Sequence, residues 1–255
     1  MSKTAIITGA TSGIGAEYAK QLAAQGYDLV VTGRREDIIR EIADELSGKH
    51  HINVDVVITE LSEAEGVQKL IDFIDPIEHI DMLINNAGFG LNKYFIRSDI
   101  DFQIRMNDVH TTASMKLIYA VLPKMISQEH GYIINVASIA GICPLVRDIV
   151  YCGSKAFLIN FSEALHMEVI NKGIKVQALC PGFTHTDFHG KLELSKSDHR
   201  KMRKLSWMSA EEVVRYSLKR LKKKKVVCIP GLANRLMVKA FRLTPRSLYY
   251  KMIMK

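Results

Sequence analysis

The chain has 255 residues, of which 47% are hydrophobic and 24% charged, a composition that allows a sizeable buried core. Its four cysteines lie far apart and in no metal-ligand spacing, which favours a reduced, cytoplasmic compartment over a disulfide framework. No uncharged apolar run reaches the roughly 20 residues that a membrane-spanning helix needs. We expect no signal peptide, because the first residues lead directly into a strand-like segment.

The net charge of +8 is unevenly distributed along the chain. Residues 213–255 hold 13 Lys and Arg and no acidic residue, whereas the preceding 212 residues hold 22 bases and 27 acids. Such a basic segment carries information about binding partners rather than about the fold. No nucleic-acid recognition motif accompanies it, so we do not expect nucleic acid to be the partner.

Short β-branched runs alternate with longer segments of helical period along most of the chain. The predicted strands are Ile6–Thr8, Leu29–Thr32, Val54–Ile58, Met82–Asn85, Tyr132–Val136, Ile174–Leu179 and Val226–Ile229. Their nearly continuous apolar composition is typical of strands buried on both faces of a parallel sheet. We therefore predict a single doubly wound, Rossmann-like α/β domain with a parallel sheet of about seven strands and helices on both faces. It should span residues 1–230, followed by a basic amphipathic extension at 231–255.

Glycines mark four of the expected helix ends. Gly26, Gly48, Gly131 and Gly173 each follow a segment of helical period. We expect each of them to adopt the left-handed conformation that commonly ends a helix.

The first predicted strand runs into a glycine-rich loop, after which a helix begins at once. The loop reads Thr8-Gly9-Ala10-Thr11-Ser12-Gly13-Ile14-Gly15, a Gly-x3-Gly-x-Gly spacing. Glycines let the backbone approach a pyrophosphate, whose charge the helix amino terminus stabilises. A plain strand-to-helix turn is the alternative interpretation. The candidate cofactor contacts in this loop are Gly9, Thr11, Ser12, Gly13, Ile14 and Gly15.

The end of the second strand bears on the choice between NAD and NADP. An NAD site usually carries a carboxylate here for the ribose 2′-hydroxyl. This chain instead reads Gly33-Arg34-Arg35. Arginine can bind a 2′-phosphate in bidentate fashion, so the pair favours NADP, although both side chains could equally begin a solvated helix.

A phenol and an ammonium group lie one helical turn apart in Tyr151-Cys152-Gly153-Ser154-Lys155. Thirteen residues before Tyr151, Ser138 follows a predicted buried strand. That position is at the carboxyl edge of the sheet, where doubly wound folds bind ligands. We interpret Cys152 as a small packing residue rather than as a redox switch.

Taken together, these motifs resemble the short-chain dehydrogenase/reductase family. The resemblance rests on Thr8–Gly15, Asn85-Asn86-Ala87-Gly88, Asn107, Ser138, Tyr151, Lys155, Pro181-Gly182 and Thr186. Within the family, the pattern is similar to the NADP-preferring branch with a basic C-terminal extension. That branch includes bacterial reductases and the steroid and 3-ketoacyl-CoA reductases.

The resemblance also implies roles for individual residues. Asn86, Ala87 and Gly88 would border the adenosine side of the cofactor. The nicotinamide carboxamide would be held by Pro181, Gly182, Thr184 and Thr186, and Asn107 would support a water-linked proton relay through Lys155. Glu60-Leu61 departs from the family pattern of Asp followed by a small apolar residue, so Glu60 is kept only as a weak adenine contact.

The implied activity is the reversible NADPH-dependent reduction of a ketone, aldehyde or 3-oxoacyl group to an alcohol. Ser138 would donate a hydrogen bond to the carbonyl oxygen and Tyr151 would act as general acid/base. Lys155 and the oxidised nicotinamide would lower the pKa of the phenol from about 10 by about 3 units. The alternatives are a non-catalytic NADPH sensor and an enzyme that performs epimerisation or dehydration. The partners are then a small carbonyl or alcohol substrate and, as in most family members, further copies in a homodimer or homotetramer.

Residues 183–208 would form a substrate lid that contains Phe183, Phe188 and Trp207. His185, Asp187 and His189 have a spacing that could suit a metal, but no step of this chemistry requires one and we expect none. The basic amphipathic stretch Leu232–Leu243 leaves three possibilities open. We favour packing or a dimer contact over binding to an anionic membrane surface or guidance of an acidic substrate.

Overall fold

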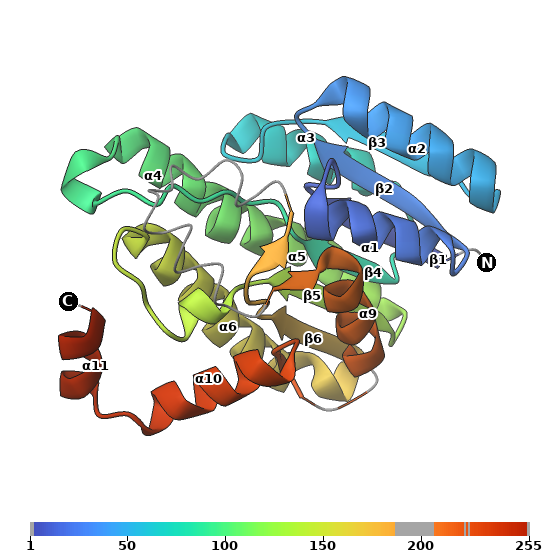
Figure 1. The fold of residues 1–255 in the computed structure, drawn as a ribbon. Helices are drawn as coiled ribbons and strands as arrows, with labels where there is room; N and C mark the ends of the chain where they lie inside the picture. Colours follow the sequence, from blue (N-terminus) through green and yellow to red (C-terminus); the bar gives the residue numbers. More distant parts are fainter. Residues whose placement is uncertain (1–2, 187–206, 222, 224, 254–255) are drawn as a thin grey trace.

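The computed structural model describes residues 3–186, 207–221, 223 and 225–253. Its main feature is a seven-stranded parallel sheet with the order β3-β2-β1-β4-β5-β6-β9 (Figure 1). The strands are β1 (Lys3–Thr8), β2 (Tyr27–Gly33), β3 (Val54–Ile58), β4 (Met82–Asn85), β5 (Gly131–Val136), β6 (Ile174–Leu179) and β9 (Val227–Cys228). A separate parallel pair consists of β7 (Thr184–His185) and β8 (Met208–Ser209). The predicted fold is therefore confirmed.

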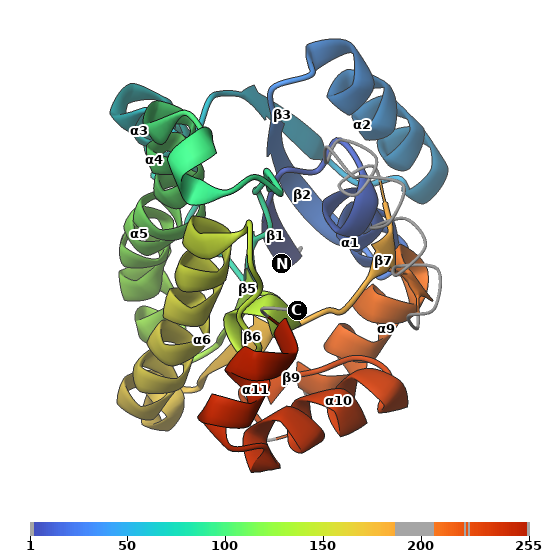
Figure 2. The same cartoon turned by 60° about the vertical axis from the view of Figure 1, so that its left-hand side comes forward.

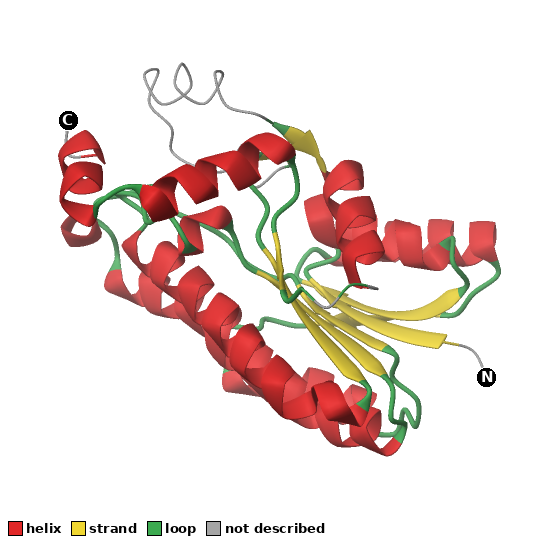
Figure 3. Ribbon diagram, turned by 90° about the horizontal axis from the view of Figure 1, so that it is seen from below, coloured by secondary structure: helices red, strands yellow, loops and turns green. Residues whose placement is uncertain are grey.

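Helices cover both faces of the sheet (Figure 3). They are α1 (Gly13–Ala23), α2 (Glu36–His50), α3 (Ala64–Ile74), α4 (Ile100–Asn107), α5 (Ala113–Ser127), α6 (Ile149–Val169), α9 (Ala210–Leu221), α10 (Leu232–Leu243) and α11 (Arg246–Ile253). Short turns are η1 (Phe95–Arg97), the π-helical η2 (Asp108–Thr112), η3 (Ile139–Gly141) and η4 (Ile170–Lys172). No helix in these ranges is long and apolar enough to cross a membrane.

The alternation of side chains along the strands builds one apolar core on each face. Ile7 and Val31 pack with the buried side of α1, α2 and α9, whereas their neighbours Ile6 and Val30 pack with α3, α5 and α6. Figure 2 shows these two groups of helices on opposite sides of the sheet. The fold thus leaves the carboxyl ends of the strands and their loops as the surface on which a site can be built.

The predicted helix ends are confirmed at two of four glycines. Gly26 and Gly173 have φ angles of 76° and 78°. The prediction for Gly48 was wrong, because α2 continues to His50 and His51 takes the left-handed conformation instead. The prediction for Gly131 was also wrong, because Gly131 begins β5 and Glu129 has the positive φ angle. Glycine is needed at this position because the main chain packs closely on Met125: a Cβ on Gly131 would lie 2.6 Å from the Met125 sulfur.

Candidate active site

Ser138, Tyr151 and Lys155 come together where β5 ends. Ser138 lies just beyond β5, and the first turns of α6 carry the other two residues. The Tyr151 and Ser138 hydroxyls are hydrogen-bonded to each other. Lys155 Nζ donates to the Val136 carbonyl at 2.8 Å and lies 5.7 Å from the centre of the Tyr151 ring. A phenol, a hydroxyl and an amine can therefore act on one group.

Burial dominates the ionisation of this cluster. It raises the pKa of the Tyr151 phenol, and the hydrogen bond with Ser138 only partly offsets the rise. Burial also lowers the pKa of the Lys155 ammonium to about 7. The sequence predicts that Lys155 and the oxidised nicotinamide together lower the pKa of Tyr151; this stays a prediction for the enzyme with its cofactor, and in the chain on its own burial raises that pKa.

Asn107 is the last residue of α4, directly before the π-helical turn η2. Its main-chain carbonyl accepts a hydrogen bond from Thr111 Oγ1 at 2.8 Å. π-helical turns often occur at functional sites because they leave a carbonyl without its usual helical partner. The relay role suggested for Asn107 stays a prediction.

His110 was missed by the sequence analysis. It lies in η2, fully enclosed, with its ring 5.7 Å from that of Tyr151. Ser154 Oγ donates to the Tyr151 carbonyl, so His110 Nδ1 donates to that Oγ at 2.8 Å and Nε2 accepts from Phe89 N at 3.3 Å. Burial, helped by the Lys155 charge, holds the pKa of His110 well below its usual value, so the ring is neutral. The residues around it, Asn107-Asp108-Val109-His110-Thr111-Thr112, are mostly polar and gave no sign that the ring would be buried.

The glycine-rich loop has the close approaches that its sequence predicts. Gly9 and Gly13 have φ angles of 68° and 59°, and α1 begins at Gly13. A Cβ on Gly9 would lie 2.8 Å from the Ala87 Cα, and one on Gly15 would lie 2.3 Å from the Gly9 oxygen. The loop therefore tolerates no side chains at these points and keeps its main chain accessible beside the α1 amino terminus.

Asn86 and Ala87 brace this loop. Asn86 Nδ2 donates to the carbonyl oxygens of Thr8 and Gly9 at 2.9 and 3.0 Å. The main-chain N–H groups of Asn86 and Ala87 both donate to Thr8 Oγ1. The side chain of Asn86 is thus engaged with the loop itself, which gives this segment a structural task besides the cofactor contact predicted for it.

The segment after β6 connects the loop with the Ser138 region. The Pro181 carbonyl accepts from Ile139 N at 3.1 Å, next to Ser138. A Cβ on Gly13 would lie 3.0 Å from the Thr186 side chain. Thr184 is buried and donates to the Gly182 carbonyl. The predicted nicotinamide-binding segment therefore spans the distance from the glycine-rich loop to the hydroxyl cluster.

Two arginines lie at the end of β2. Arg35 Nη2 donates to Thr11 Oγ1 at 2.7 Å and to Ser12 Oγ at 2.9 Å, on the glycine-rich loop. Arg34 is exposed and forms an ion pair with Glu60 at 2.9 Å. This ion pair and a hydrogen bond from the Ser62 main chain hold the pKa of the Glu60 carboxyl below its usual value, against the opposing effect of its burial.

Comparison with known proteins decides the family. The sequence profile of short chain dehydrogenases matches residues 3–197. The chain is a short-chain dehydrogenase. It is therefore an oxidoreductase that acts on CH–OH or carbonyl groups with NAD(P).

Relatives and solved structures agree with this assignment. An uncharacterised oxidoreductase of Staphylococcus saprophyticus is 34% identical over 189 residues, 74% of this chain and 81% of the relative. The NADP-dependent 3-hydroxy acid dehydrogenase of Schizosaccharomyces pombe is 33% identical, with 86% and 87% coverage. The structure of a short-chain dehydrogenase from Sphingobium yanoikuyae in complex with NADPH has a TM-score of 0.85 at 29% identity, covering 94% of this chain and 92% of that one.

Most of the segment predicted as a lid in this dehydrogenase, including Asp187, Phe188 and His189, lies outside the described residues. At its described ends, Trp207 packs 5.4 Å from the Phe183 ring and stacks 4.8 Å from the His185 ring. His185 is thus engaged with an aromatic neighbour.

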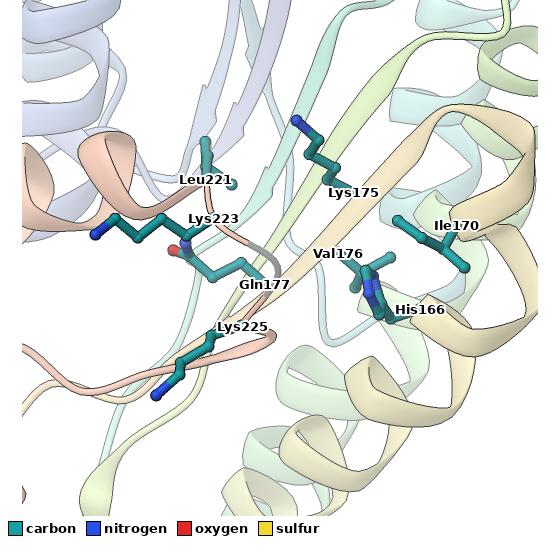
Figure 4. A pocket seen from close by; sticks show the side chains of 8 residues that line it. All are labelled: His166, Ile170, Lys175, Val176, Gln177, Leu221, Lys223 and Lys225. Carbon is teal, nitrogen blue, oxygen red and sulfur yellow. The ribbon is translucent and has the colours of Figure 1, made fainter.

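A pocket of the dehydrogenase at the opposite edge of the sheet does not belong to this site. It is lined by His166, Ile170, Lys175, Val176, Gln177, Leu221, Lys223 and Lys225. Lys175 lies near the start of β6, whereas the hydroxyl cluster lies beyond the end of β5. The three lysine ammonium groups point in different directions (Figure 4), so they do not form a binding site for one anion.

Proposed function

We propose that this chain is an NADPH-dependent reductase that converts a ketone, aldehyde or 3-oxoacyl group to an alcohol, reversibly. The hydrogen-bonded pair of Tyr151 and Ser138 hydroxyls beside the buried Lys155 is the observation that carries the proposal. The 3-hydroxy acid dehydrogenase among the relatives supports a substrate with an oxidisable hydroxyl or a reducible carbonyl.

The residues at the end of β2 support NADP as the cofactor. Gly33 supplies no carboxylate of the kind typical of NAD sites, and a side chain there would have to displace Thr11, because its Cβ would lie 2.6 Å from Thr11 Cγ2. The Arg35 guanidinium is hydrogen-bonded to Thr11 of the glycine-rich loop, and Arg34, the preceding residue, is exposed. Two guanidinium groups fit a 2′-phosphate, and that phosphate would compete with Glu60 for Arg34.

Bound NADPH would supply the hydride for the carbonyl carbon. The chain's own groups then manage the carbonyl oxygen, on which negative charge develops. Ser138 donates a hydrogen bond to this oxygen and Tyr151 transfers its proton to it. Lys155, held by the Val136 carbonyl, places a titratable amine near Tyr151 and favours the phenolate that remains.

A direct test is NADPH oxidation measured with a panel of ketones, aldehydes and 3-oxoacyl thioesters. A reductase consumes NADPH only when a carbonyl substrate is present. A non-catalytic sensor would bind NADPH and leave every substrate unchanged.

We also propose that the protein is cytoplasmic and forms a homodimer or homotetramer through α4, α5 and α6. These helices lie side by side in Figure 2 and expose large apolar residues. They include Ile100, Ile104, Met115, Tyr119, Phe157 and Met167. Tyr119, 82% exposed, is the best probe, since Tyr119→Glu would place like charges at a symmetric contact. Light scattering should then show a smaller particle.

A further inference from the structure

Helix α10 has one face attached to the protein. Val238 is buried in an apolar cluster with Ala137 and Ile139, the residues on either side of Ser138. Asn234 is also buried and bonds to the Pro230 carbonyl, and a Cβ on Gly182 would lie 2.5 Å from its side chain. This inner face therefore docks α10 beside the candidate active site.

The outer face of α10 is an uncovered leucine stripe. Leu232, Leu236 and Leu243 are 64%, 58% and 75% exposed. At 3.6 residues per turn these three lie within a sector of about 40°, roughly opposite the sector of Asn234 and Val238. A helix that already has a packed face gains nothing from a second leucine stripe in water, so this stripe indicates a partner.

Basic residues lie on one side of the stripe. Lys239 falls about 20° outside the sector of the leucines and Arg242 about 80° outside it on the same side, both exposed. No acidic residue follows Glu212 in the chain. Two copies of this face brought together would place like charges in contact, whereas an anionic lipid surface offers phosphates for the bases and acyl chains for the leucines.

Helix α11, which follows α10, contacts the loop that precedes the helix of Tyr151 and Lys155. Tyr249 of α11 donates to the Pro144 carbonyl, in the loop between Ser138 and Tyr151. That loop exposes Leu145 and Val146, and α6 exposes Ile149 at its start. A surface that covers α10 and α11 would therefore also lie against the rim of the site.

We propose that α10 and α11 bind the protein to an anionic lipid surface, with Leu232, Leu236 and Leu243 at the acyl boundary and Lys239 and Arg242 on headgroup phosphates. This orientation turns the rim of the site toward the lipid. Resting on the proposed function, the substrate is then a lipophilic carbonyl compound that enters from the membrane.

Vesicle sedimentation of the full chain tests the docking without any activity. Protein should sediment with phosphatidylcholine vesicles that contain phosphatidylserine, more weakly with phosphatidylcholine alone, and more weakly at high salt. Leu236→Ser combined with Leu243→Ser, and separately Lys239→Glu combined with Arg242→Glu, should each lower partitioning at least about tenfold. Phe73→Ser, at an exposed apolar site on α3 outside both proposed surfaces, is the control and should sediment as the unchanged protein does.

Melting curves and light scattering of the same variants complete the test. Unchanged melting and mass together with lost sedimentation support lipid docking. Absence of sedimentation with phosphatidylserine, or equal loss in the Phe73→Ser control, overturns it. A smaller particle for the leucine variant would assign the stripe to a second copy instead, which also overturns it.

A second readout addresses the substrate class. The leucine variant should lose rate at least fivefold with a long-chain ketone presented in anionic vesicles and keep its rate with a short, water-soluble ketone. Equal rates for the variant and the unchanged protein with the vesicle-borne ketone would refute the lipophilic substrate. Failure of the unchanged protein on both ketones would instead refute the proposed function and leave the sedimentation result standing.

Discussion

His110 Nδ1 lies 2.8 Å from the Oγ of Ser154, a residue that is 44 positions away in the chain. The contact joins the π-helical turn η2 to the helix that carries Tyr151 and Lys155. On the other side of the same ring, Nε2 accepts from the main chain of Phe89, next to Gly88. A single neutral imidazole thus ties the segment after β4 to the helix of the candidate proton donor.

This link predicts energetic coupling between His110 and Ser154. His110→Ala should destabilise the protein by about 2–4 kcal/mol, because it opens a cavity and removes the hydrogen bonds to Ser154 Oγ and Phe89 N. In a double-mutant cycle with Ser154→Ala, urea unfolding should show a coupling energy of about 1 kcal/mol. Ser162→Ala, two turns further along α6, should be additive with His110→Ala. If the destabilising effects of His110→Ala and Ser154→Ala were additive, the two side chains would not be coupled and the prediction would be wrong.

Lys155 predicts a particular dependence of stability on pH. Its pKa is about 7 in the folded chain and about 10.4 in an unfolded one, so between these values the unfolded state binds more protons. The free energy of unfolding should therefore rise with pH from 7 to 10, relative to Lys155→Met, by at most about 1.4 kcal/mol per unit. Urea titrations of both proteins at several pH values measure this difference. If the difference in unfolding free energy between the two proteins stayed constant or fell with pH, the pKa of Lys155 would not be lowered in the folded chain.

Tyr151→Phe tests the proton donor. The substitution removes the hydroxyl that bonds to Ser138 but keeps the ring beside His110. Turnover should fall at least about 100-fold while NADPH affinity stays nearly unchanged, because only the transferred proton is lost. Steady-state kinetics and fluorescence titration with NADPH give the two numbers. A variant that keeps more than a tenth of the rate would rule out Tyr151 as the donor.

The two arginines after β2 should set the cofactor preference. We expect NADPH to bind at least about tenfold more tightly than NADH, a difference of about 1.4 kcal/mol. Replacing Arg34 and Arg35 together by Ala should remove most of this preference. Arg40→Ala, at an exposed ion pair with Glu36 on α2, is the matched control and should leave it intact. Equal affinity of the unchanged protein for both cofactors would disprove the assignment.

The sequence alone predicted the elements whose signals are local. Strand runs such as Val54–Ile58 and Met82–Asn85 were found with their observed ends. Met82–Asn85 is buried throughout, and the edge strand Val54–Ile58 was recognisable from its β-branched residues despite the exposed Asp55. The juxtaposition of Ser138, Tyr151 and Lys155 was also predictable. The spacing of Tyr151 and Lys155 on one helical turn and the place of Ser138 after a strand are local signals, and the family resemblance they carry implied that the three act together.

Tertiary structure decided the features that depend on distant partners. Gly48 and Gly131 did not end their helices, and the left-handed residues that follow α2 and α5 are His51 and Glu129. The pairing of Arg34 with Glu60 joins residues 26 positions apart.

The same holds for His110 and for α10. The two partners of His110 come from segments that only the fold brings together. The sequence showed apolar residues all around α10, but only its packing through Val238 determined which of them face outward. Periodicity along a chain records which residues share a face, whereas the choice of the covered face is made by the free energy of contacts between distant segments.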